Sequence, residues 1–173
     1  MDEKREVEKA VRYLKSHGQM TISILLAAFL VWLFGVLVFI PLAESINWQT
    51  RVFVSLLFFT TFSFLIFGAM SSAKKLIDAF AFFPARKYGV EKGLSYANAL
   101  TLFKCFFYIV CALILYGLYS PFLTSFHPAV NGIVLIVVLV LIFFLFLRIF
   151  SILLPKFTEW LMKTQKAFLE NVQ

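Results

Sequence analysis

Four long apolar segments constrain this chain more than any other feature of its sequence. They cover residues 21–43, 52–73, 100–121 and 130–154. A helix crosses about 30 Å of hydrocarbon with about 20 apolar residues. Where water is absent, every backbone N–H and C=O must be hydrogen-bonded within the protein, and a helix achieves this within one segment. The sequence therefore predicts an all-α integral membrane protein with four transmembrane helices.

Composition supports a single membrane domain over residues 1–173. Hydrophobic residues make up 62% of the chain and charged residues 14%, whereas soluble domains are about 45–50% apolar and about 25% charged. The first two segments carry no formal charge, and Lys104 and Arg148 lie near the ends of the third and fourth. Long basic side chains at such positions can reach the headgroups while their stems stay in hydrocarbon.

The distribution of charge predicts the orientation of the helices. When the four segments alternate across the bilayer, all basic residues except Arg51 and all acidic residues except Glu44 fall on one side. Cytoplasmic segments accumulate Lys and Arg. We therefore expect a multi-pass protein with both termini in the cytoplasm, and with the formal net charge of +7 on that side.

Both ends of the chain are predicted to form amphipathic helices on the membrane surface, where the apolar face of such a helix is buried. In residues 1–18, the apolar side chains that recur at helical spacing are Val7, Ala10, Val11 and Leu14. In the tail, residues 155–173, the apolar side chains are Phe157, Trp160, Leu161 and Phe168.

The connection between the second and third helices, residues 74–99, is predicted to form a basic cytoplasmic elbow. Pro84 is expected to break the helix because it lacks a backbone N–H and crowds the preceding turn. The residues expected to contact anionic lipid headgroups are Lys74, Lys75, Arg86, Lys87 and Lys92. No nucleic acid is expected as a partner, because the basic residues are spread over three segments beside the bilayer. Asp78 and Arg148 are a candidate ion pair.

Small and hydroxyl-bearing residues gather in the second helix. They are Ser55, Thr60, Thr61, Ser63, Gly68, Ser71 and Ser72. Such side chains let helices approach closely and hydrogen-bond across the contact, so helix packing is the first interpretation. A hydrophilic stripe that lines a pore is the alternative.

The sequence offers no set of residues that predicts catalysis, a cofactor or a metal site. Catalysis needs a nucleophile with a base, paired carboxylates or a metal cluster. His17 and His127 are expected on opposite faces of the membrane, and Cys105 and Cys111 lie on different faces of one helix. We therefore expect a protein that is not an enzyme and that binds no cofactor.

From the second helix onward, the order of elements resembles a known family. An out-to-in helix is followed by the basic segment SSAKKLIDAFAFFPARKYG, an in-to-out helix that ends in YGLYSP, and a final out-to-in helix. This order is similar to the membrane-spanning part of small-conductance mechanosensitive channels, without their Gly- and Ala-rich pore helix and their cytoplasmic domain. The resemblance implies an oligomeric channel subunit.

Two functions are compatible with these observations. The first is a non-enzymatic multi-pass membrane protein that acts through helix–helix contacts, as an assembly or accessory subunit, with a second copy or another membrane protein as its partner. The alternative is an oligomeric channel or pore-forming subunit.

Overall fold

A computed structural model describes the backbone of residues 2–89 and 95–170, with the side chains of 18–87 and 95–155 and of Phe157, Thr158 and Met162. These residues form five α-helices and two π-helical turns, and no strand occurs among them. In chain order the elements are α1 (Asp2–Phe34), η1 (Gly35–Phe39), α2 (Ile40–Glu44), α3 (Trp48–Pro84), η2 (Ala85–Gly89), α4 (Tyr96–Phe126) and α5 (Pro128–Glu170). The predicted all-α fold is confirmed.

Four stretches of helix are long and apolar enough to cross a membrane. They are Gly18–Glu44, Trp48–Lys87, Tyr96–Phe126 and Pro128–Pro155. Each contains one of the four predicted segments, so the predicted number of helices with the length and composition to span a membrane is confirmed. The second stretch is much longer than predicted, because α3 continues beyond the apolar segment.

The helix break predicted at Pro84, within the elbow of residues 74–99, is wrong. The helix α3 runs through Lys74 and Lys75 to Pro84 and passes directly into η2. Pro84 removes one hydrogen bond, but the Ala85 N–H contacts the carbonyls of both Ala81 and Phe82, and the backbone stays helical to Gly89. Because α4 begins at Tyr96, the connection between the two helices is short. Residues 90–94, including Lys92, lie outside the described residues.

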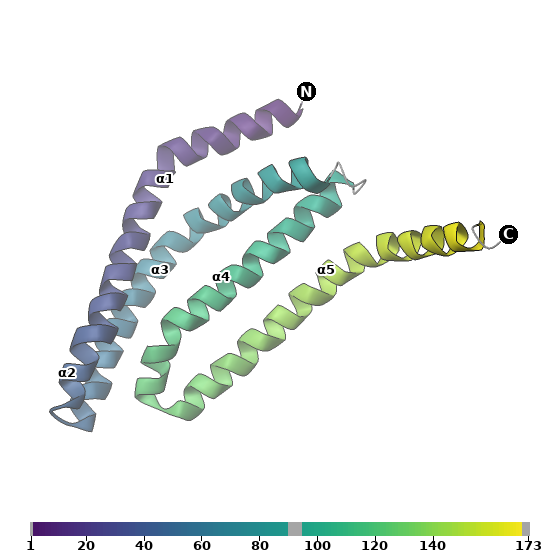
Figure 1. The fold of residues 1–173 in the computed structure, drawn as a ribbon. Helices are drawn as coiled ribbons and strands as arrows, with labels where there is room; N and C mark the ends of the chain where they lie inside the picture. The colour runs from purple at the N-terminus through teal and green to yellow at the C-terminus, as the bar shows by residue number, and fades with distance from the viewer. Residues whose placement is uncertain (1, 90–94, 171–173) are drawn as a thin grey trace.

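Consecutive spans lie side by side and form a row (Figure 1). The helix α1 packs on α3, α3 packs on α4, and α4 packs on α5, which places α5 at the edge of the row. The loops after α2 and α4 are at one end, and η2 and both chain termini are at the other. The N-terminal part of α1 turns away from α3 at this second end, so the two helices diverge there.

The core lies between α1, α3 and α4, in the half of the molecule that holds the two short loops. Its fully buried members are Ala28, Ile40, Phe62 and Phe122. The Phe62 and Tyr119 rings meet edge to face with centroids 5.0 Å apart, and Phe59 meets Tyr119 in the same way at 5.5 Å. Such aromatic pairs contribute about 0.5–1.5 kcal/mol each beyond the burial of their area.

Gly35, the first residue of η1, lies against Phe58 of α3 without room for a side chain. A Cβ atom at this position would lie 2.7 Å from Cδ1 of Phe58, a distance that carbon atoms do not tolerate without movement. The Phe58 ring also stacks on Phe39, with centroids 5.1 Å apart. The wider π turn is closed by a hydrogen bond from the Ile40 N–H to the Gly35 carbonyl, immediately before Pro41. The absence of a side chain at Gly35 therefore sets the spacing of the first two spans.

Candidate functional site

The small and hydroxyl residues of α3 do not form one stripe. Ser55 is fully buried and Ser63 is half-buried, on the side that faces the core. Thr60, Thr61, Gly68 and Ser71 are exposed, and Ser72 is half-buried. A helix turns about 100° per residue, so this split follows from their positions along α3. The predicted set therefore belongs to two different surfaces.

The core-facing side of α3 is tied to α4 by a hydrogen bond that joins two spans. The Tyr119 hydroxyl donates to the Ser63 Oγ at 3.1 Å. The Trp32 Nε1–H donates to the Leu118 carbonyl at 2.8 Å and joins α1 to α4. Pro121 has no N–H to donate to the Gly117 carbonyl, which directly precedes the Leu118 carbonyl that accepts from Trp32. The sequence analysis missed Trp32 and Tyr119, although Pro121 marks the turn that receives Trp32.

The other side of α3 is an uncovered surface, which we call the α3 outer face. It consists of Phe53, Leu56, Leu57, Thr60, Thr61, Gly68 and Ser71. The first five line a shallow open hollow. The Thr60 and Thr61 hydroxyls donate to carbonyls of their own helix, those of Leu56 and Leu57, at 2.8 and 2.9 Å. At Gly68, an added Cβ atom would meet nothing within 4 Å.

The structure gives Asp78 a different partner from the one proposed from the sequence. Its Oδ1 lies 2.9 Å from the Nζ of Lys104, so the ion pair joins α3 to α4. Arg148 lies on α5, is exposed, and forms no ion pair with Asp78 among the described residues. The candidate pair of Asp78 and Arg148 is therefore replaced by Asp78 and Lys104. The neighbouring helix α4, rather than α5, covers this part of α3.

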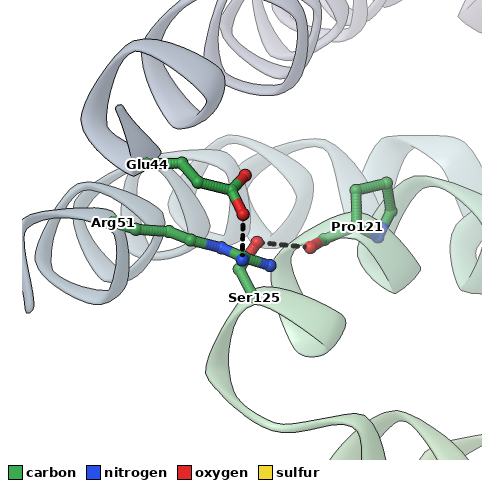
Figure 2. Close-up of polar contacts among 4 residues, drawn as sticks. All are labelled: Glu44, Arg51, Pro121 and Ser125. Atoms are coloured by element: carbon green, nitrogen blue, oxygen red, sulfur yellow. Dashed lines mark hydrogen bonds and ion pairs between the residues drawn. The ribbon is translucent and has the colours of Figure 1, made fainter. Parts of the chain in front are cut away.

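A second ion pair lies at the opposite end of the row. Arg51 Nη1 donates to Glu44 Oε1 at 2.6 Å, across the short loop between α2 and α3. Figure 2 shows this pair beside the last turns of α4, where the Ser125 Oγ donates to the Pro121 carbonyl at 2.9 Å. Glu44 and Arg51 are the two charged residues that the sequence analysis predicts on the outer side. Their pairing leaves this end of the molecule without net charge among the described residues.

The basic residues expected at lipid headgroups fall on two elements. Lys74 and Lys75 are exposed on α3, and Arg86 and Lys87 are exposed on η2. Lys92 lies outside the described residues. Two phenylalanines between these pairs, Phe80 and Phe83, are about half exposed.

The reactive side chains of the described part of the chain are dispersed. Within that part, no three His, Cys, Asp or Glu residues come close enough to hold a metal ion. Cys105 is a buried free thiol and Cys111 a half-buried one. The Nδ1 of His127 accepts a hydrogen bond from the Ala129 N–H at 3.1 Å, so this ring nitrogen caps the first turn of α5.

Comparison with known proteins gave no match to a family model, a curated protein or a solved structure. The resemblance to the membrane-spanning part of small-conductance mechanosensitive channels therefore stays a prediction.

Proposed function

We propose that this chain is a non-enzymatic, multi-pass integral membrane protein that acts through lateral helix–helix contacts, as an assembly or accessory subunit. The observation that carries this proposal is the α3 outer face. Small residues at a helix surface allow a second helix to approach closely within a bilayer. At Gly68 this space is open, and in the described part of the chain the hollow next to Thr60 and Thr61 is open as well.

We propose that the occupant of this face is a transmembrane helix of another subunit, supplied either by a second copy of this chain or by a different membrane protein. The hollow offers room for a bulky apolar side chain between Phe53 and Leu57. Because Thr60 and Thr61 already donate to their own helix, the contact would depend on shape rather than on new hydrogen bonds.

The proposed orientation places both termini in the cytoplasm. The Glu44–Arg51 pair would then face the outer side, and the basic residues near the ends of α3 and α5 would face the cytoplasmic leaflet. The preference of Lys and Arg for cytoplasmic segments supports this orientation. Impermeant labelling of single cysteines introduced next to Arg51 and at the chain ends tests it, and labelling of the two chain ends from opposite sides would contradict it.

The decisive experiment fills the open space at Gly68 with a large side chain. We expect Gly68→Leu to abolish the higher-mass species or the copurifying partner seen by native mass measurement in mild detergent, because the new side chain would occupy the contact. Gly117→Leu is the matched control, since an added Cβ at Gly117 also meets nothing within the chain. A wild-type protein that is monomeric and without a partner would contradict the proposal.

The alternative is an oligomeric channel in which the α3 outer face lines a pore. Exposed Thr60 and Thr61 support it, whereas the large apolar side chains that surround them do not. Ion flux through liposomes that contain the purified protein separates the two functions. Flux that is lost on Thr61→Val would favour the channel, and an assembled but non-conducting protein would favour the accessory subunit.

A further inference from the structure

The connection between α2 and α3 carries large apolar side chains that the described part of the chain leaves uncovered. Leu42 is 60% exposed, Ile46 is 66% exposed and Trp48 is 68% exposed. They lie in or beside the three-residue loop 45–47, at the end of the row that holds the short loops (Figure 1). We call residues 42–51 the α2–α3 turn. Apolar side chains of this size are unfavourable in water, so the turn needs an apolar environment.

The backbone of the loop satisfies its own polar groups. The Ser45 N–H donates to the Pro41 carbonyl at 3.2 Å. The N–H groups of Ile46 and Asn47 donate to the Ala43 carbonyl at 3.2 and 3.3 Å. An irregular segment loses hydrogen bonds in a lipid environment only where its N–H groups depend on water. The loop therefore meets the condition for contact with lipid.

Polar side chains of the α2–α3 turn are also paired within the chain. The Oδ1 of Asn47 accepts from the Thr50 N–H at 2.7 Å and from the Thr50 Oγ1 at 2.8 Å, which caps the start of α3. The Ser45 Oγ donates to the carbonyl three residues before it at 2.7 Å. Glu44 and Arg51 neutralise each other in their ion pair. The turn thus has no formal net charge.

The position of Arg51 sets the depth of the turn. The uncharged stretch that follows it, residues 52–73, rises about 33 Å at about 1.5 Å per residue, which matches a hydrocarbon thickness of about 30 Å. Arg51 therefore lies at the boundary of the hydrocarbon. Trp48 begins α3 three residues earlier, about 4.5 Å further out, whereas the headgroup layer is about 5–7 Å thick on each side. The start of α3 thus lies within this layer.

We propose that the α2–α3 turn is embedded in the lipid leaflet on its side of the membrane. Leu42 and Ile46 enter the boundary between headgroups and acyl chains. Trp48 lies in the same layer, where lipid covers the indole ring and a lipid oxygen accepts from its N–H. Because the turn is neutral, a zwitterionic leaflet is sufficient. The inference holds for either orientation of the chain and does not rest on the proposed function.

The embedded turn also fixes the depth of the hollow on the α3 outer face. The residues that line the hollow run from Phe53 to Thr61. They begin about 3 Å and end about 15 Å inside the boundary at Arg51. Because half of the hydrocarbon is about 15 Å thick, the whole hollow lies in the leaflet that holds the turn. A helix that fills it must place its large apolar side chain in that half of the bilayer.

Trp48 can report its own depth in the full-length protein, after Trp32→Phe and Trp160→Phe, in vesicles of phosphatidylcholine. We expect lipids brominated near the headgroup end of the acyl chain to quench its fluorescence more than lipids brominated near the methyl end, and we expect little quenching by iodide. Strong quenching by iodide alone would place the turn in water and overturn the proposal. Weak quenching by all three probes would show a protein cover and would overturn it as well.

A spin label keeps the test valid if the tryptophan variant does not fold. We expect a label at Ile46→Cys, in a chain with Cys105→Ala and Cys111→Ala, to be accessible to oxygen and shielded from a water-soluble nickel chelate, equally with and without phosphatidylglycerol. Phe64→Cys, near the middle of the same membrane and 75% exposed, is the control and should give a higher ratio of oxygen to nickel access. Ready access of nickel at position 46 would overturn the proposal, as would dipolar coupling there between two copies.

Discussion

The α3–α4 pair is held together in two different ways along its length. Toward the short loops, large rings fill the space between α3 and α4, and α1 completes the core through Ala28 and the Trp32 hydrogen bond. Toward η2, buried alanines and the Phe82–Tyr96 ring pair lie between the two helices. The N-terminal part of α1 diverges there, and the half-buried Asp78–Lys104 ion pair joins α3 to α4. The comparison teaches that one pair of helices can be packed by a large aromatic cluster where a third helix contributes and by small side chains where two helices meet.

Removal of a core ring should produce the largest effect. Phe62 is fully buried between α3 and α4, so we expect Phe62→Ala to destabilise the fold by about 3–5 kcal/mol, the range for large-to-small changes in packed cores. Reversible unfolding in mixed detergent micelles measures this. Phe64, which is 75% exposed on the same helix, provides the control: Phe64→Ala should cost far less. Equal losses would mean that the rings do not form a core.

Enlargement of an alanine tests the other end of the pair. Ala81 is fully buried near the η2 end of α3, and Ala81→Leu should cost about 1–3 kcal/mol by overpacking. The same unfolding assay applies, and cross-linking between cysteines placed at this end would report separation of the two helices there. Ala97 is exposed on α4, so Ala97→Leu should be nearly neutral. A neutral Ala81→Leu would contradict the close packing of this end.

Loss of the Tyr119–Ser63 hydrogen bond should have a smaller effect. Tyr119→Phe keeps the ring and its contacts with Phe59 and Phe62, and we expect a loss of about 0.6 kcal/mol, the mean for hydrogen bonds between membrane helices. Ser63→Ala should cost a similar amount, and the double variant should cost no more than either. Additive losses in this cycle would show that the two hydroxyls act independently.

The Asp78–Lys104 pair should contribute least. The Asp78 side chain is 40% exposed and that of Lys104 is 33% exposed, and solvent screening limits such pairs to about 0–1 kcal/mol. We expect Asp78→Asn to lower stability by a few tenths of a kcal/mol at low salt, an effect that should fade at high salt. Arg148→Gln is the control and should not change the cost of Asp78→Asn. A coupling between Asp78 and Arg148 would restore the pair proposed from the sequence.

The number and type of spans could be predicted because one physical requirement decides them. Backbone N–H and C=O groups must be hydrogen-bonded within the protein inside a bilayer, and four predominantly apolar segments are long enough to form helices that meet this condition. The continuation of the helix beyond Pro84, through residues 85–89, could not be predicted in this way. Pro84 indicated a break, but the turn around it keeps hydrogen bonds through Ala85 and continues as η2.

The division of the α3 hydroxyl set could not be predicted because α3 is apolar on all sides. A helix with phenylalanine at positions such as 53, 59, 62 and 67 gives no polar face from which to orient it. The contacts with α4 determine which side of α3 faces the core. Tyr119 of α4 donates a hydrogen bond to Ser63, and Lys104 of α4 forms an ion pair with Asp78. Residues that act as spacers, such as Ala81 and Gly35, carry no chemical signal in the sequence.

The edge position of α5 has a consequence for biosynthesis. The core cluster draws on α1 to α4 and on no residue of α5 among those described, and α5 packs mainly on α4. All residues of this core cluster are therefore synthesised before the ribosome has completed the fourth span. A chain truncated after His127 should already pack α1, α3 and α4 as the full-length protein does. The helix α5 should then pack on α4 after these helices have assembled.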